Sequence, residues 1–193
     1  IKQFLSQVAE VSGLRNSDIF YEKAFLVVEG ESEEAGMGLL YKTYTGKTMP
    51  EDGIVLINIR TNGQWNNILK FLSANKSTCT VLLLDSDTQQ PESTRQVTAQ
   101  KLQDSGFDAS FLGDHCFFIG TKEFEDTYPD ADLALMANQK FPKSDGSTWI
   151  DTDFAALRTL DKFSSELSRL ISTEHRGQAT KPMIAYEMAL LYD

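Results

Sequence analysis

Short apolar runs that alternate with segments of helical spacing constrain the fold of this chain more than any other feature. The runs are AFLVVE (24–29), GIVLINI (53–59), CTVLLLD (79–85) and HCFFIG (115–120). Each has the length and composition of a buried strand, whereas the segments 32–44, 62–76 and 93–106 between them have the apolar spacing of helices. Strands that alternate with helices predict a parallel sheet covered by helices on both faces, and therefore an α/β fold class.

The character of the sequence changes after about position 128. The segments 130–141, 152–172 and 180–192 are predicted to be helices, and no candidate strand follows the fourth apolar run. The segment before position 20 also has helical spacing and is typical of a helix that enters from an upstream part. We therefore expect a helical tail over 1–19, an α/β domain over 20–128 and a helical subdomain over 129–193.

Composition restricts the classes of function. The net charge of −10 argues against binding of nucleic acid by bulk electrostatics, although an acidic chain can act on DNA when divalent cations mask its carboxylates. No apolar run is long enough to span a membrane, and the first residues do not have the pattern of a signal peptide.

The cysteine and histidine residues also restrict the chemistry. Cys79 and Cys116 lie in apolar segments and are expected to be free thiols in a reducing cytoplasm. The separated His115 and His175 argue against a zinc site.

Pairs of carboxylates follow three of the predicted strands. They are Glu29 with Glu33, Asp85 with Asp87, and Glu123 with Glu125. Ligands collect beyond the carboxyl ends of parallel strands, so these pairs are expected at one edge of the sheet. Each pair alone has a simpler interpretation, as charge in a first helical turn, a cap or a turn residue. Carboxylates that converge without a cation would repel one another, so we expect Mg²⁺ or Mn²⁺, and two such ions suit the hydrolysis of a phosphodiester.

Two segments resemble the signatures of the Toprim domain: VVEGESEE, with Glu-Gly and a further acidic residue, and LLLDSDTQ, with Asp-x-Asp. This domain occurs in topoisomerases, bacterial primases, recombination mediators and nucleases of the OLD (overcoming lysogenization defect) family. The stretch GTKEFEDTY, the helical C-terminal portion and the lysine of TKPMIAYEMA resemble the OLD-type nucleases in particular.

The resemblance implies a Rossmannoid Toprim domain that nicks or cleaves DNA as a two-metal endodeoxyribonuclease. The catalytic residues would be Glu29, Asp85 and Lys181. The metal ligands would be Glu29, Glu33, Asp85 and Asp87, and the pair Glu123/Glu125 would complete the second site, with either glutamate as the coordinating residue; Thr121 would be an added hydroxyl ligand. The cofactors would be two Mg²⁺ or Mn²⁺ ions, with Ca²⁺ as a non-productive substitute. The partners would be DNA and an upstream ATPase domain of the same polypeptide, through which the protein would also form oligomers. No membrane partner is expected.

Other interpretations of these motifs account for less of the sequence. TYTGKT (43–48) lacks the first glycine and the preceding strand of a phosphate loop, so no ATP site is expected. A haloacid-dehalogenase phosphatase would leave Glu29 and Glu33 unexplained. A receiver-like domain would leave the helical appendage unexplained. Within the Toprim superfamily, a non-catalytic module that binds DNA or a partner, a primase and a topoisomerase stay open.

Contacts with DNA are expected from basic residues, and a solvated basic edge is the alternative interpretation. The candidates are Lys122, Arg158, Lys162 and Arg176, followed by Lys140, Lys143 and Arg169. Within the predicted helix 152–172, the spacing of Arg158, Lys162 and Arg169 places positive charge on neighbouring turns.

Overall fold

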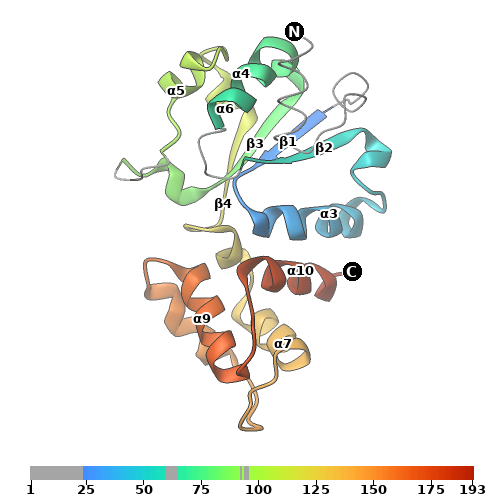
Figure 1. Ribbon diagram of the computed structural model, residues 1–193, viewed down its shortest axis with the longest axis vertical. Coiled ribbons are helices and arrows are strands. Elements are labelled where there is room, and N and C mark those ends of the chain that lie inside the picture. Colours follow the sequence, from blue (N-terminus) through green and yellow to red (C-terminus); the bar gives the residue numbers. More distant parts are fainter. Residues whose placement is uncertain (1–23, 60–64, 92, 94–95) are drawn as a thin grey trace. The chain divides into compact units, whose positions relative to one another are not determined.

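The computed structural model describes residues 24–59, 65–91, 93 and 96–193 (Figure 1). The helical tail predicted over 1–19 lies outside these residues. The described chain forms two compact units. One, the sheet unit, contains the described residues up to Gly30 together with Lys47–Phe118. The other, the helical unit, contains Glu31–Gly46 and Ile119–Asp193.

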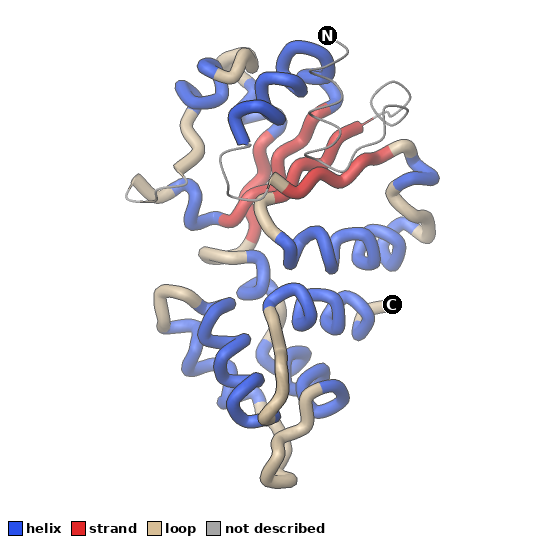
Figure 2. The backbone as a smooth tube through the Cα atoms, viewed as in Figure 1, coloured by secondary structure: helices blue, strands red, loops and turns tan. Residues whose placement is uncertain are grey.

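The sheet has four strands in the order β2-β1-β3-β4, and all of them are parallel. Figure 2 shows the strands, in red, side by side. They are β1 (Ala24–Val28), β2 (Ile54–Asn58), β3 (Thr80–Asp85) and β4 (Cys116–Ile119). The central strand β1 pairs with β2 on one side and with β3 on the other, where Val28 lies opposite Leu83. The predicted α/β class with a parallel sheet is therefore confirmed, and β1 and β3 end next to each other.

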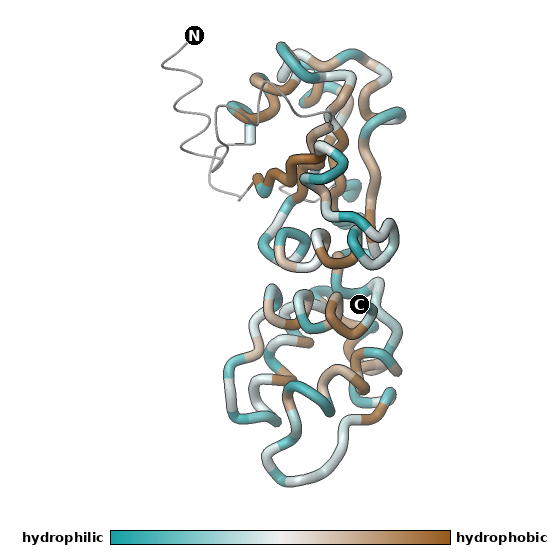
Figure 3. The backbone as a smooth tube through the Cα atoms, turned by 90° about the vertical axis from the view of Figure 1, so that its right-hand side faces the viewer, coloured by the Kyte–Doolittle hydropathy of each residue, from teal (hydrophilic) through white to brown (hydrophobic). Residues whose placement is uncertain are grey.

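One face of the sheet builds the core of the sheet unit. Side chains alternate along a strand, so Phe25 and Val27 of β1 and Leu82 and Leu84 of β3 point to the same face, and all four are buried. Figure 3 shows the apolar residues concentrated along the strands. The helix α4 (Trp65–Lys76) packs against this face with the apolar stripe that the sequence predicted.

The remaining elements of the sheet unit are short. They are the 3₁₀ helices η1 (Pro50–Asp52), η2 (Ser77–Cys79) and η3 (Ser86–Gln89), and the α-helices α5 (Ala99–Asp104) and α6 (Phe111–His115). The predicted helix 93–106 is wrong at its start, because the Thr98 side chain accepts a hydrogen bond from Lys101 N and caps the helix there. The five-residue α6 was missed, since so short a segment has no readable periodicity.

The helical unit is built from elements that are far apart in the sequence. They are α3 (Glu31–Thr45), η4 (Phe124–Thr127), α7 (Asp130–Lys140), α8 (Asp151–Ala155), η5 (Ala156–Thr159), α9 (Phe163–His175) and α10 (Lys181–Leu191). The helices α3 and α10 pack closely, because Gly36 has no side chain: a Cβ there would lie 3.2 Å from the Ala185 carbonyl oxygen. The predicted helical C-terminal portion is thereby confirmed.

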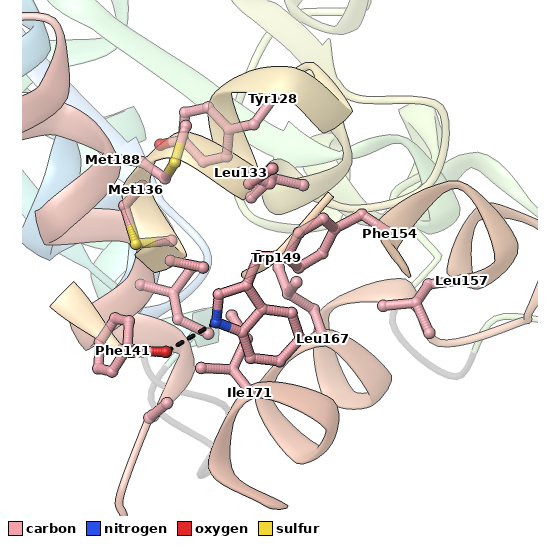
Figure 4. Packing of buried hydrophobic residues seen from close by; sticks show 14 of the residues in the cluster. Tyr128, Leu133, Met136, Phe141, Trp149, Phe154, Leu157, Leu167, Ile171 and Met188 are labelled. Carbon is pink, nitrogen blue, oxygen red and sulfur yellow. Dashed lines mark hydrogen bonds between the residues drawn. The ribbon is translucent and has the colours of Figure 1, made fainter. Parts of the chain in front are cut away.

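Large side chains fill the core of the helical unit (Figure 4). Trp149 lies in the connection between α7 and α8, with 2% of its surface exposed, and its ring packs against Phe154. Its indole N–H donates a hydrogen bond of 2.7 Å to the Phe141 carbonyl oxygen. A connection that looks polar in the sequence is thus anchored by one buried aromatic residue.

The prediction of a single helix over 152–172 is wrong. The backbone of Leu160 is extended, and α9 begins only at Phe163. The break allows Arg158 to bond to the Asp130 carboxylate (2.8 Å) and to the carbonyl oxygens of Asp126 and Tyr128. These bonds stabilise the turn, and Leu160 is 41% exposed.

The domain boundaries predicted at 20–128 and 129–193 stay a prediction. The two compact units divide the chain differently, since α3 belongs to the helical unit and the later division falls after Phe118. Cys79 and Cys116 are free thiols, and burial raises the pKa of Cys116 to about 12. No helix in the described part of the chain has both the length and the hydropathy that a membrane span requires.

Candidate metal centre

Three carboxylates of the sheet unit meet at the carboxyl ends of β1 and β3. Glu29 follows β1 directly, Asp85 is the last residue of β3, and Asp87 lies in η3. One oxygen from each of the three lies within 4.8 Å of the others. The backbone N–H of Asp85 donates to Glu29 Oε2 at 3.4 Å, so the two strand ends are also joined directly. We call these three residues the strand-end group.

The turn after β3 brings Asp87 back towards the other two carboxylates. The Thr88 hydroxyl donates a hydrogen bond of 2.6 Å to the Asp85 carbonyl oxygen, and the Val97 N–H donates to the Thr88 carbonyl oxygen. Thr88 itself is buried, with 1% of its surface exposed. The Asp-x-Asp spacing keeps Asp85 and Asp87 near each other in the sequence. The buried Thr88 fixes the turn that orients their side chains.

The strand-end group has the chemistry of a site for a hard divalent cation. Three carboxylates this close repel one another unless a cation or a proton neutralises them. Mg²⁺ binds oxygen at about 2.0–2.1 Å, so two oxygens on opposite sides of the ion lie about 4.2 Å apart. The separation of up to 4.8 Å is therefore only slightly wider than a filled site. Glu29, 9% exposed, is held on the buried side of the group.

A second set of predicted site residues lies in the helical unit. It contains Glu33 on α3, Glu123 and Glu125 around η4, and Lys181 at the start of α10. Glu33 and Glu125 are only 3% and 4% exposed. The Ser32 hydroxyl donates a hydrogen bond of 2.5 Å to Glu125 Oε1. We call Glu33, Glu123 and Glu125 the helical-unit carboxylates.

The two glutamates of the EFE segment (123–125), Glu123 and Glu125, have different surroundings. Burial raises the pKa of Glu125, and the Ser32 hydrogen bond and the Lys181 charge only partly oppose this. Glu123 accepts hydrogen bonds of 2.8 Å from both the backbone N–H and the hydroxyl of Ser164. Lys181 Nζ lies 3.8 Å from Glu123 Oε1. The predicted lysine and a predicted ligand are therefore neighbours within one unit.

The sequence predicted one shared centre, and the structure shows two groups, each inside its own unit. Glu29, Asp85 and Asp87 are brought together as predicted. That these three share a pair of ions with the helical-unit carboxylates stays a prediction. The ligand role of Thr121 also stays a prediction: the residue is exposed, and its backbone N–H bonds to Asp126.

Most of the basic residues predicted to contact DNA already have partners in the helical unit. Lys122 bonds to the Leu160 carbonyl oxygen and lies 3.5 Å from Asp161. Each of the three guanidinium nitrogens of Arg158 donates one of the hydrogen bonds described above. Ion pairs also join Lys140 to Glu187, Lys143 to Asp153 and Arg169 to Glu166. The predicted stripe on one helix is wrong, because Arg158, Lys162 and Arg169 do not share a helix. Lys162 and Arg176 are exposed.

Sequence reasoning missed three polar residues that surround the carboxylates: Ser32, Asp126 and Ser164. Ser32 stands inside the GESEE motif, and its place beside Glu33 could have drawn attention to it. Asp126 directly follows the EFE segment, where an acidic residue three positions after Glu123 is typical of a cap. Ser164 gave no signal, because it is 41 positions from the residue that it contacts.

The parallel sheet with acidic residues at neighbouring strand ends is consistent with an α/β fold of the Toprim type. Residues 20–87 match the family described as "Overcoming lysogenization defect protein-like, TOPRIM domain", which confirms the predicted resemblance to the Toprim domain of OLD-family proteins. The matched residues include β1, β2, β3 and the strand-end group, and they end before Glu123, Glu125 and Lys181. Neither the curated proteins nor the solved structures contain a match.

The family match has a direct functional meaning at a coarse level. Toprim domains bind divalent metals and occur in nucleases, primases and topoisomerases, and the OLD-like type indicates metal-dependent processing of nucleic acid. The strand-end group agrees with this class of chemistry, since its three oxygen donors suit a hard cation.

Proposed function

We propose that this chain is the nuclease region of an OLD-type protein and that it hydrolyses phosphodiester bonds of DNA with two divalent cations, Mg²⁺ or Mn²⁺. The observation that carries the proposal is the strand-end group, because Glu29, Asp85 and Asp87 converge within the segment that matches the OLD-like Toprim family. Three carboxylates within 4.8 Å have a clear use in holding a cation and a clear energetic cost without one.

Each residue has a distinct part in this mechanism. The strand-end group would hold the first cation, and the helical-unit carboxylates, with Thr121, would hold the second. Two such ions would activate a water molecule and neutralise charge on the leaving oxygen. Lys181, with its side chain 38% exposed, is available to stabilise negative charge that develops on the phosphate. Lys162 and Arg176, which are exposed, are candidates for contact with the DNA backbone.

Other Toprim functions are less well supported. A topoisomerase needs a nucleophilic tyrosine that reaches DNA, whereas Tyr128 is 4% exposed and burial raises the pKa of its hydroxyl. Tyr186 is exposed on α10, and no basic partner is described for it. A non-catalytic binding module would not need the full set of acidic residues, and every predicted position carries one. A cytoplasmic location and an upstream ATPase partner stay part of the proposal.

A plasmid nicking assay tests the proposed function directly. The 193-residue chain is incubated with supercoiled plasmid and with Mg²⁺, Mn²⁺, Ca²⁺ or a chelator. We expect nicking with Mg²⁺ or Mn²⁺, none with the chelator and little with Ca²⁺. Glu29→Gln should abolish nicking. The matched control is Glu51→Gln, an exposed carboxylate of the same unit that bonds only to Thr48 among the contacts described, and it should leave nicking unchanged.

Two results would contradict the proposal. Cleavage that persists in chelator would remove metal from the mechanism. Equal loss of activity in the Glu29 and Glu51 variants would show that the assay reports on general stability and not on the strand-end group.

A further inference from the structure

The loop that leaves β4 is held by one carboxylate that the proposed chemistry does not use. Asp126 Oδ1 accepts a hydrogen bond of 2.7 Å from Thr121 N. Its Oδ2 accepts bonds of 2.7 Å from Lys122 N and 3.0 Å from Glu123 N. Three consecutive backbone N–H groups therefore converge on one side chain. Hydrogen bonds to an ionised acceptor are about twice as strong as neutral ones, so Asp126 sets the backbone of 121–123.

The first residue of this loop, Gly120, cannot be replaced by a larger residue without a change in the backbone. Gly120 has a φ of 76°, in the left-handed region that favours glycine. A Cβ at this position would lie 2.0 Å from the Glu123 carbonyl oxygen and 2.5 Å from Asp126 Oδ1. The loop folds back on itself so tightly that only glycine fits. The backbone of Glu123 is thereby fixed from both sides.

The side chain of Glu123 is fixed separately, by the first turn of α9. Ser164 donates to both carboxylate oxygens, through its backbone N–H to Oε2 and through its hydroxyl to Oε1, each at 2.8 Å. Ser164 is 1% exposed, and the Glu123 side chain is 12% exposed. Bonds this well shielded from water are not readily exchanged for bonds to solvent.

We infer that Asp126 and Ser164 are positioning residues for the second cation: Asp126 fixes the backbone of Glu123, and Ser164 fixes its carboxylate. The inference rests on the proposed function and deepens it by naming the residues that arrange one ligand group. A ligand that is already in place loses little conformational entropy when a cation binds, so its supporting residues raise the affinity for the metal. Neither residue needs to touch the metal or the DNA.

The first test uses two aspartates with equivalent places in short helices of the same unit. Asp126 accepts from the backbone N–H of the residue before η4, and Asp153 accepts in the same way from Ile150 N before α8, at 3.1 Å. Asp126→Asn replaces one acceptor oxygen by a donor that faces other donors. We expect the Mn²⁺ concentration for half-maximal nicking to rise about tenfold or more in Asp126→Asn. In Asp153→Asn it should change less than about twofold, although both variants lose a capping bond.

The second test uses two serines on α9 and does not depend on the first variant folding. Ser164→Ala removes the hydrogen bond from the Ser164 hydroxyl to Glu123. Ser168 lies one turn later on α9, and Ser168→Ala removes a hydrogen bond of 2.6 Å from its hydroxyl to the Ala179 carbonyl oxygen. Calorimetric titration with Mn²⁺ should show two ions bound to the unaltered chain. Ser164→Ala should weaken one of the two and leave the other unchanged, whereas Ser168→Ala should bind both as before.

The outcomes separate this inference from the proposed function. If Ser164→Ala and Asp126→Asn keep the metal dependence of the unaltered chain while Glu29→Gln is inactive, the positioning roles are wrong and the nuclease proposal stands. If the unaltered chain binds no Mn²⁺, both fail. If all four variants weaken Mn²⁺ equally, the effect is one of stability, and the positioning roles are again wrong.

Discussion

The Ser32 hydroxyl donates a hydrogen bond of 2.5 Å to Oε1 of Glu125, a residue 93 positions later in the chain. Ser32 belongs to the motif that contains Glu33, and Glu125 belongs to the EFE segment, which lies beyond the matched part of the chain. The bond is buried and lies within the helical unit. The bond therefore joins VVEGESEE to GTKEFEDTY by direct contact, in addition to the resemblance of both segments to OLD-family proteins.

Glu125 should give the stability of the protein a distinctive dependence on pH. Burial raises its pKa above the ordinary 4.5, so the folded state holds this proton more tightly than the unfolded state. Between the two pKa values the folded state binds more protons, and stability from this group falls as pH rises. Glu125→Gln should remove this loss and raise the free energy of unfolding at pH 7. Urea unfolding between pH 4 and 7 measures the effect.

The control for this experiment is Glu166→Gln, on α9, where the carboxylate forms a surface ion pair with Arg169. Surface ion pairs contribute about 0–1 kcal/mol, so this variant should be equal to or slightly less stable than the unaltered chain. An identical pH profile for Glu125→Gln and the unaltered chain would contradict the elevated pKa.

Asp85→Asn should remove the stabilisation of the protein by metal. A cation that binds only the folded state adds about 2.7 kcal/mol at a concentration one hundred times its Kd, and this appears as a rise in melting temperature. The unaltered chain should melt higher with Mn²⁺ than with chelator, and Asp85→Asn should melt at the same temperature in both. Without metal the variant should be at least as stable as the unaltered chain, because one of three neighbouring negative charges is gone.

Asp104→Asn is the comparison for this prediction. Asp104 ends α5 in the same unit and accepts a hydrogen bond from Gln100. It should keep the full response to Mn²⁺. A normal response in the Asp85 variant would show that the strand-end group is not the site of the stabilising ion.

Lys181→Met should slow cleavage with little effect on metal binding. A positive group that stabilises charge in the transition state contributes about 100-fold to 1,000-fold in rate, so a loss of this size is expected under saturating Mn²⁺. Lys140→Met, which breaks the ion pair with Glu187, should have no such effect. Lys181 also lies 3.8 Å from Glu123. A variant that recovers full rate at high Mn²⁺ would therefore show that Lys181 acts on the ligand and not on the phosphate.

The strands and the strand-end group could be predicted because their signals are local. A buried strand is a continuous apolar run, and parallel topology places the residues after β1 and β3 at one edge whatever the rest of the chain does. Glu29, Asp85 and Asp87 follow from these two facts. The register that pairs Val28 with Leu83 then sets their proximity.

The contacts that fix the helical unit could not be predicted from the sequence. The break at Leu160 accompanies the hydrogen bonds of Arg158 to Asp130 and to two carbonyl groups outside its own helix. The periodicity of the sequence alone favours a continuous helix there. In the same way, α3 follows β1 in the sequence yet packs against α10 at the other end of the chain. Both outcomes depend on tertiary contacts, which override local propensity.

Gly120→Ala should be among the most damaging single substitutions in the helical unit. Its φ of 76° costs an alanine about 1–2 kcal/mol, and the added Cβ would overlap the Glu123 carbonyl oxygen at 2.0 Å. Gly146→Ala separates these two effects, since Gly146 has a similar φ of 82° and no atoms near its Cβ position. Urea unfolding should show a loss of about 1–2 kcal/mol for Gly146→Ala and at least about 1–3 kcal/mol more for Gly120→Ala, the usual cost of overpacking. Equal losses would mean that the β4 exit loop opens to admit the methyl group, and the fixed placement of Glu123 would then be wrong.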